Sequence, residues 1–114
     1  MAIVYLSLGT NIGNRQANLA DAVNKIWKSL GKVLQKSGIY ETEPWGFESD
    51  NFLNQVIEVE TANDPDSLIA GCLQIEKEMG RDRNNNVGYS PRIIDIDILF
   101  YNDLVVQEEN LIIP

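Results

Sequence analysis

Residues 93–101 restrict the fold more than any other part of this sequence. They are mostly β-branched or aromatic, and two aspartates, Asp95 and Asp97, stand among them two positions apart. Alternate side chains of a β-strand share one face, so both carboxylates would point the same way, roughly 6.6 Å apart along the chain. The opposite face would carry Ile94, Ile96, Ile98 and Phe100. The pattern predicts a strand with one apolar face toward a core and two acids on the other.

Two carboxylates on one sheet face repel each other and lose hydration, which favours a bound cation. Mg²⁺ is the natural candidate, because it prefers carboxylate oxygens and completes its octahedron with water and phosphate oxygens. Two acids and a triphosphate can complete a binuclear site. The alternative is a solvated sheet face on which the acids pair with Arg92. Both alternatives stay open at this point.

Three arginines, Arg81, Arg83 and Arg92, fall within 12 positions just before this strand. Guanidinium groups suit phosphate oxygens and can stabilise the charge on a transferring phosphoryl group. Residues 81–92 are polar and Asn-rich, without a helical or strand period, and a loop of this length is usually functional. We therefore predict a lid over bound phosphates. The alternative is a set of exposed ion pairs, each worth under about 1 kcal/mol.

Apolar periodicity predicts the order strand, helix, strand, strand, helix, strand. The expected strands are residues 2–8, residues 33–43 with an interruption near Ser37 and Gly38, residues 52–60, and residues 93–101. The expected helices follow Asn14 and Asp64 and end at Gly31 and Gly80, the first with an apolar stripe of Leu19, Val23, Ile26, Trp27 and Leu30. This order predicts an α+β fold, the ferredoxin-like βαββαβ plan, with an antiparallel sheet and two packed helices in one domain over residues 1–114. The helices could share one side of the sheet or bracket it.

The net charge of −8, from 17 acidic and 9 basic residues, argues against binding to nucleic acid or to an anionic membrane. A small anionic ligand fits better. The single cysteine, Cys72, allows no intramolecular disulfide and is compatible with a cytoplasmic location. Because the sequence has no histidine to activate its thiol, Cys72 is predicted to be a core residue on the apolar face of the second helix.

Aromatic residues occur in and directly after the loop at residues 43–51, and Tyr89 stands in the segment 81–92. Trp45, Phe47, Phe52 and Tyr89 could form a flat slot for a heterocycle, with the Asn54 amide matching its edge. They could equally be core residues, and both interpretations stay open.

Five motifs follow one another at residues 8–13, 40–46, 52–54, 75–81 and 91–99. The last, Pro-Arg-x-x-Asp-x-Asp-Ile-Leu, is the most distinctive. Together they resemble the 6-hydroxymethyl-7,8-dihydropterin pyrophosphokinase family of folate biosynthesis. The resemblance implies transfer of the terminal pyrophosphate of ATP to the hydroxymethyl oxygen of the pterin, giving AMP and the pterin diphosphate.

The same resemblance implies roles for individual residues. Asp95 and Asp97 would hold two Mg²⁺ ions, and Arg81 and Arg92 would be catalytic, binding phosphates and stabilising the transition state. The residues implied to contact ATP, the co-substrate, are Glu76, Arg83, Arg92 and Ile98. Those implied to contact the pterin are Thr42, Glu43, Trp45, Phe52, Asn54 and Tyr89.

The sequence departs from the family pattern in four ways. Thr10 stands where Ser is commoner, Ser90 where Gly is commoner, and Tyr89 where Trp is frequent. Family members also continue past the position of Pro114 by roughly a third of this length, with a His-containing segment that contacts the nucleotide and an aromatic that covers the pterin. We therefore expect a domain that is C-terminally incomplete relative to the family, and a homodimer that covers exposed apolar surface. The alternative function is a non-catalytic ferredoxin-like pterin-binding or assembly module, or an inactive fragment of the enzyme.

Overall fold

The computed structural model describes residues 1–43, 51–80, 93–102 and 104–105. Its elements are β1 (Ala2–Thr10), α1 (Arg15–Ser29), β2 (Gly31–Lys36), β3 (Tyr40–Thr42), β4 (Phe52–Thr61), α2 (Pro65–Gly80), β5 (Asp95–Tyr101) and β6 (Leu104–Val105). The strands form one antiparallel sheet in the order β2-β4-β1-β5-β6, and β3 also pairs with β4. This order confirms the predicted α+β, ferredoxin-like plan.

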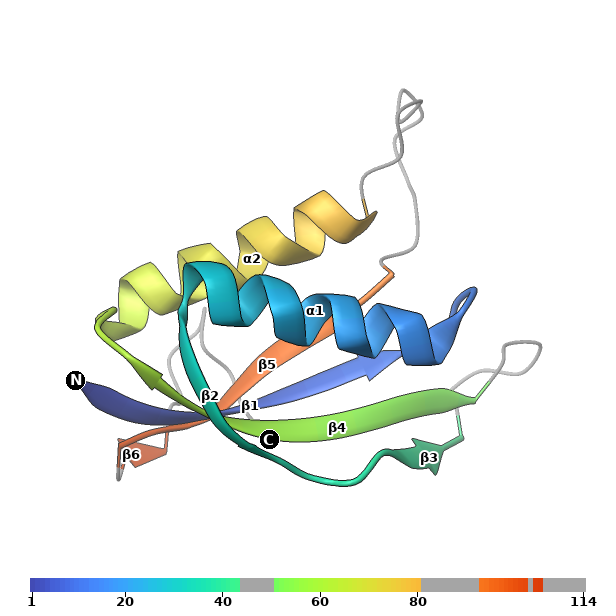
Figure 1. Cartoon of the computed structure of the whole chain (residues 1–114), viewed down its shortest axis with the longest axis horizontal. Helices are drawn as coiled ribbons and strands as arrows, with labels where there is room; N and C mark the ends of the chain where they lie inside the picture. Colours follow the sequence, from blue (N-terminus) through green and yellow to red (C-terminus); the bar gives the residue numbers. More distant parts are fainter. Residues whose placement is uncertain (44–50, 81–92, 103, 106–114) are drawn as a thin grey trace.

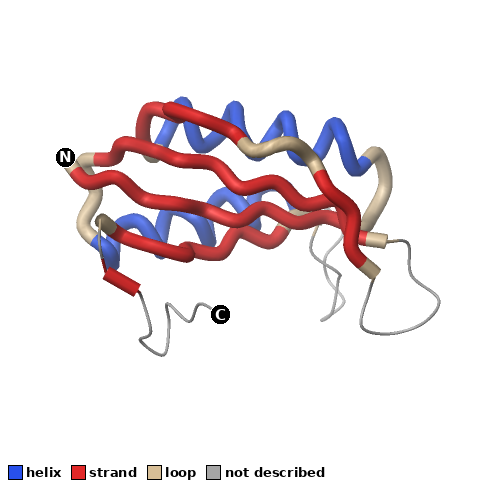
Figure 2. Tube along the Cα trace, turned by 90° about the horizontal axis from the view of Figure 1, so that it is seen from below, coloured by secondary structure: helices blue, strands red, loops and turns tan. Residues whose placement is uncertain are grey.

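Both helices lie on the same face of the sheet (Figure 1), which settles the arrangement that the sequence left open. Figure 2 looks onto the opposite face, where the described residues place no helix. We call it the open face. None of the helices in the described ranges is long and apolar enough to cross a membrane.

The core lies between the helices and the sheet. Every second residue of β1 is buried, and β4 continues the alternation with Gln55, Ile57, Val59 and Thr61. The helices add Leu19, Ala22, Ile26, Leu68, Cys72 and Ile75. Burial raises the pKa of the Cys72 thiol to about 12, with smaller contributions from Glu76 and Asp97. The predicted role of Cys72 as core filler is therefore confirmed.

Both helix starts follow the predicted capping chemistry. Asn14 Oδ1 accepts a hydrogen bond from the Ala17 N–H at 3.0 Å, and Asp64 Oδ1 accepts one from the Ser67 N–H at 2.8 Å. The bond from the Ser67 backbone lowers the pKa of Asp64 by favouring its charged form.

The strand predicted over residues 33–43 is interrupted as expected. β2 and β3 both pair with β4, and residues 37–39 separate them. Ser37 bridges the break, because its N–H donates to Val56 O at 2.8 Å and its hydroxyl accepts from the Val56 N–H at 2.9 Å. The interruption therefore leaves β3 beside β4, where it carries Thr42 next to Phe52.

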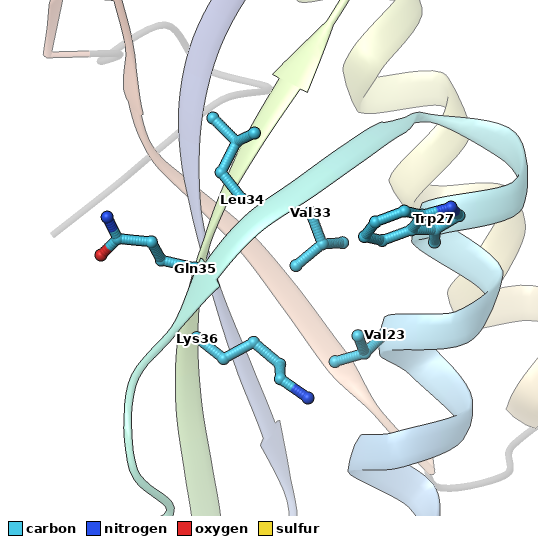
Figure 3. A pocket seen from close by; sticks show the side chains of 6 residues that line it. All are labelled: Val23, Trp27, Val33, Leu34, Gln35 and Lys36. Atoms are coloured by element: carbon cyan, nitrogen blue, oxygen red, sulfur yellow. The ribbon is translucent and has the colours of Figure 1, made fainter.

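One predicted core residue of α1 is wrong. Trp27 is 51% exposed, whereas Leu19, Ile26 and Leu30 of the same stripe are buried. Successive helical residues point about 100° apart, so the position after Ile26 turns out of the core. Trp27 instead lines a surface groove of about 280 Å³ between α1 and β2, with Val23 and Val33 (Figure 3).

The prediction that Phe100 lies on the same face as Ile94, Ile96 and Ile98 is also wrong. The pairing of β1 with β5 shifts register between Tyr5 and Leu6, which pair with Phe100 and Ile98 and leave Leu99 as an extra residue. Such a bulge turns the following side chains over. Phe100 therefore shares a face with Tyr5, with ring centroids 6.2 Å apart at 90°, and is 43% exposed.

Replacing Gly31 with Ala is expected to destabilise the fold. A Cβ at this position would lie 2.1 Å from Glu60 O, a backbone atom of the neighbouring strand, so β2 must move away from β4. Overpacking of this kind costs about 1–3 kcal/mol, and Tm should fall by at least about 4 °C. Gly38→Ala is the matched control, since a Cβ there has nothing within 4 Å. Equal melting temperatures for the two variants in calorimetry would contradict this.

Candidate active site

The two aspartates of β5 lie on the open face. Between and after them in the chain, Ile96 and Ile98 are only 6% and 5% exposed in the core, and Asp95 and Asp97 point the other way. This confirms that the carboxylates share one face. Asp95 is partly buried and Asp97 is exposed.

Small residues stand beside both aspartates. Across the β1–β5 ladder, Asp95 pairs with Gly9 and Asp97 with Ser7. On its other side, Gly9 pairs with Asn54 of β4. A Cβ on Gly9 would come within 3.2 Å of Asn54 Oδ1. Because Gly9 has no side chain, β1 places no side-chain atoms between the Asp95 carboxylate and the Asn54 amide.

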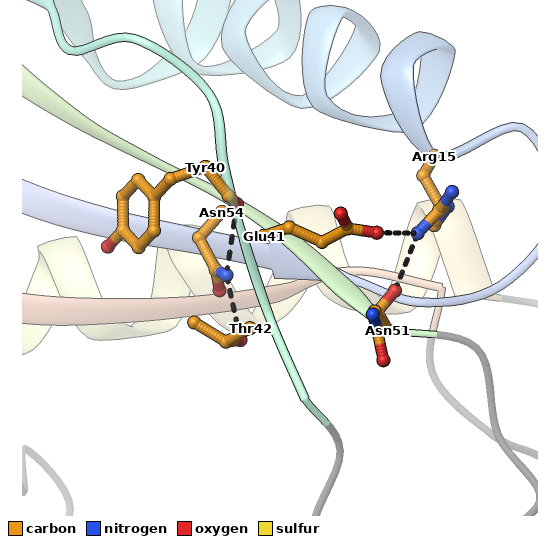
Figure 4. Close-up of polar contacts among 6 residues, drawn as sticks. All are labelled: Arg15, Tyr40, Glu41, Thr42, Asn51 and Asn54. Carbon is orange, nitrogen blue, oxygen red and sulfur yellow. Dashed lines mark hydrogen bonds and ion pairs between the residues drawn. The ribbon is translucent and has the colours of Figure 1, made fainter.

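The Asn54 amide is oriented by β3. Its Nδ2 donates to Tyr40 O at 3.3 Å and to Thr42 Oγ1 at 3.0 Å (Figure 4). Both amide hydrogens are thereby directed at β3, and no described residue donates to Oδ1, which lies toward Gly9. The sequence predicted a donor and an acceptor for a ligand, whereas the geometry leaves the acceptor.

The other described residues that were predicted to contact the pterin lie at the same end of the sheet. Thr42 and Phe52 are register partners in β3 and β4, and Glu43 follows Thr42 directly and is exposed. The remaining predicted site residues, and the lid predicted over residues 81–92, lie outside the described residues: Trp45, Phe47, Arg81, Arg83, Tyr89 and Arg92.

Two of the residues predicted to contact ATP, Glu76 and Ile98, are buried in the fold. Glu76 of α2 is 6% exposed, and its Oε2 accepts a hydrogen bond from the Ile96 N–H at 2.7 Å. This bond joins α2 to β5 at the residue between the two aspartates. Ile98 packs in the core. Their contact with ATP stays a prediction.

Sequence reasoning missed Arg15, the first residue of α1. One guanidinium nitrogen, Nη1, donates to Asn51 O at 2.8 Å and lies 3.4 Å from Glu41 Oε2 (Figure 4). Arg15 thus connects α1 to β3 and to the residue before β4. The sequence did carry a signal for this contact, because Arg15 directly follows the helix cap Asn14. A positive charge is unfavourable at a helix N-terminus, so such a residue is expected to pair with a group outside the helix.

Asp95 and Asp97 are the described carboxylates that could hold Mg²⁺, which usually needs only one or two carboxylates from the protein. Among the described residues, no three His, Cys, Asp or Glu side chains lie close enough to hold an ion. Two carboxylates on an open face leave the remaining positions to water and phosphate oxygens, which is how Mg²⁺ is usually bound with nucleotides.

The fold and these residues define a class: a ferredoxin-like α+β protein with a carboxylate pair on the open face of its sheet. The model of the 7,8-dihydro-6-hydroxymethylpterin-pyrophosphokinase family matches residues 5–114. The chain belongs to this family. Membership favours the enzyme over a non-catalytic binding module.

Curated relatives agree with this assignment. The 2-amino-4-hydroxy-6-hydroxymethyldihydropteridine pyrophosphokinase of Porphyromonas gingivalis is 45% identical over 104 residues, covering 90% of this chain and 71% of the relative. That of Methylorubrum extorquens is 41% identical over 116 residues, covering 100% of this chain and 72% of the relative. The chain is thus shorter than these relatives, as expected.

A solved structure supports the fold. The wild-type HPPK-DHPS of Plasmodium falciparum superposes with a TM-score of 0.68 at 22% identity, covering 90% of this chain and 27% of that one. This chain therefore spans less than a third of the Plasmodium protein, and the likeness concerns the fold alone.

Proposed function

We propose that this chain transfers pyrophosphate from ATP to 6-hydroxymethyl-7,8-dihydropterin. The hydroxymethyl oxygen attacks the β-phosphorus of ATP and the bond from that phosphorus to the α,β-bridging oxygen breaks. AMP leaves, and the hydroxyl proton passes to solvent. Family membership carries the choice of reaction, and the shared face of Asp95 and Asp97 is the observation that carries the site.

In this proposal Asp95 and Asp97 hold two Mg²⁺ ions through their carboxylate oxygens. Bound Mg²⁺ supplies neutralisation of phosphate charge and a template for an in-line displacement. The open face supports this role, because the apolar side of β5 is buried in the core, whereas Asp95 is only partly buried and Asp97 is exposed on the other side.

Arg81 and Arg92 are proposed to bind the transferring phosphates and stabilise charge in the transition state, and Arg83 and Glu76 to seat ATP. Arg92 immediately precedes Ile93, the first described residue before β5. In the sequence, Arg92 stands two positions before the buried Ile94 and three before Asp95, one of the proposed metal ligands.

The pterin is proposed to lie beside Asn54, with Thr42, Glu43, Phe52, Trp45 and Tyr89 around it. The Asn54 Oδ1 is directed at the space over Gly9 and can accept a hydrogen bond from a ring N–H or amino group. Gly9 pairs with Asn54 on one side and with Asp95 on the other, so the proposed heterocycle and phosphate ends of the site are two strands apart in one register row.

Replacing Asn54 with Leu is expected to weaken pterin binding about tenfold to a hundredfold. The variant removes the acceptor and the two bonds to β3, at about 1–3 kcal/mol for an unmet polar group. Calorimetric titration with the dihydropterin measures the change. Asn24→Leu, on exposed α1 surface, is the control. Equal affinities for both variants would exclude Asn54 from the pterin site.

The reaction itself is tested by following AMP formation from ATP, Mg²⁺ and the dihydropterin. The assay compares this chain with a chimera extended past Pro114 by the corresponding segment of a curated relative. AMP from this chain supports the proposal, whereas AMP from the chimera alone would show that the reaction needs the added segment. No AMP from either would refute the catalytic function.

Two finer assignments accompany the proposal. We place the protein in the cytoplasm, supported by the absence of cysteine pairs in its sequence. We also propose a homodimer, on the argument of exposed apolar surface, which includes Ile39 and Phe100 at 46% and 43% exposure. Sedimentation equilibrium distinguishes the dimer from a monomer.

A further inference from the structure

We propose that Thr10 and Asn18 form a positioning pair that fixes the start of β5 and thereby the carboxylate of Asp95. Its catalytic consequence rests on the function proposed above. Thr10 is the last residue of β1 and only 1% exposed, and Asn18 is the fourth residue of α1. Neither residue carries chemistry of its own in the reaction.

The pair makes a continuous chain of hydrogen bonds. Thr10 Oγ1 donates to Ile93 O at 2.6 Å, and it accepts from Asn18 Nδ2 at 3.1 Å. The other hydrogen of the same amide nitrogen reaches Ile12 O at 2.7 Å. The Thr10 hydroxyl thus donates its single proton to Ile93 O while its oxygen accepts the hydrogen bond from Asn18.

This series of hydrogen bonds begins where the backbone pairing of β1 with β5 ends. The pairing of β1 with β5 stops at Gly9 and Asp95, and Asp95 is the first residue of β5. The backbone hydrogen bonds at the end of a strand open easily unless further contacts hold that end in place. The bond from Thr10 to Ile93 O extends the connection two residues beyond Asp95, with a side chain in place of a ladder bond.

Asp95 is thereby held from both sides along the chain. Ile93 O is bound by Thr10, and the Ile96 N–H is bound by the buried Glu76. Fixing these two backbone atoms restricts the position from which the Asp95 carboxylate projects. The bound carbonyl belongs to the peptide that joins Ile93 to Ile94, so one hydroxyl orders the backbone that leads into a proposed metal ligand, Asp95.

The fold contains a matched control at the far end of the sheet. Thr61 is also 1% exposed, donates through Oγ1 to Leu30 O at 2.6 Å, and accepts from Asn63 Nδ2 at 3.0 Å. It pairs with Ala2 at the start of β1, whereas Thr10 ends that strand. Thr61→Val therefore removes the same kind of bond at the same burial, away from Asp95.

The test compares Thr10→Val, Thr10→Ser and Thr61→Val in this chain, or in the extended chimera if only that one forms AMP. Both valine variants should lower Tm to a similar degree. Only Thr10→Val should accelerate hydrogen exchange at the amides of residues 94–97, reduce kcat about tenfold to a hundredfold, and raise the Mg²⁺ concentration for half-maximal rate. Thr10→Ser keeps the hydroxyl and should restore kcat to within about twofold.

Equal kcat for the two valine variants would overturn the proposal, and so would unchanged exchange at residues 94–97 in Thr10→Val. If neither unmodified protein forms AMP, the proposed function fails by itself. The exchange comparison then still decides whether Thr10 holds the start of β5: faster exchange supports the tether, and unchanged exchange refutes it.

Discussion

Replacing Asp97 with Ala is expected to lower the rate of AMP formation about 10³-fold. A bound Mg²⁺ stabilises phosphate charge by several kcal/mol, and each 1.36 kcal/mol is a factor of ten in rate. Asp97 is the more exposed of the two acids on β5, so its removal leaves the core side of the strand intact. The initial rate over a range of Mg²⁺ concentrations measures the loss.

The control for this variant is Glu60→Ala. Glu60 is an acid of β4 that pairs with Ile3, toward the other end of β1. Its removal should change the rate by no more than about twofold, as expected for a surface substitution. Asp97→Asn should raise the Mg²⁺ requirement while keeping the shape of the side chain. A rate for Asp97→Ala equal to that of Glu60→Ala would exclude Asp97 as a metal ligand.

Replacing Arg92 with Ala is expected to reduce kcat about 10³-fold, in the range of arginines that stabilise a transferring phosphoryl group. The dissociation constant of ATP should change less than tenfold, because in the proposed role the guanidinium acts mainly on charge that develops in the transition state. Single-turnover kinetics together with equilibrium ATP binding separate the two quantities.

Arg92→Lys provides the comparison within this series. Lysine keeps the positive charge but lacks the planar fork that binds two phosphate oxygens at once. Its kcat should fall between those of the unmodified chain and Arg92→Ala. If ATP affinity drops in Arg92→Ala while kcat is unchanged, Arg92 serves in binding alone.

The order of elements was predictable because periodicity and capping residues agreed. Asn14 and Asp64 accept the amide hydrogen bonds that their residue types predicted, and the acids of β5 face away from Ile96 and Ile98. Each of these features depends on neighbours within a few positions. The sequence alone therefore carries them.

The errors arose where a feature depends on distant contacts. Phe100 changed faces because of a bulge against β1, which strict alternation cannot represent. Trp27 follows Ile26 at the edge of the helical stripe, about 100° further round, and the contacts made in the fold leave it 51% exposed.

The supporting contacts of the site were equally invisible in the sequence. Thr10 and Ile93 are 83 positions apart, and Glu76 and Ile96 are 20 apart. The residue types gave no sign that these pairs meet, since a threonine at a strand end and a glutamate on a helix usually face solvent. Only the antiparallel register of β1 and β5, with α2 above them, brings each pair together.

The most direct test is a crystal structure of this chain with Mg²⁺ and a non-hydrolysable ATP analogue. We predict carboxylate oxygens of both Asp95 and Asp97 at about 2.0–2.1 Å from Mg²⁺, with phosphate oxygens completing the coordination. A nucleotide bound elsewhere, with both carboxylates bonded only to arginine side chains, would contradict the account.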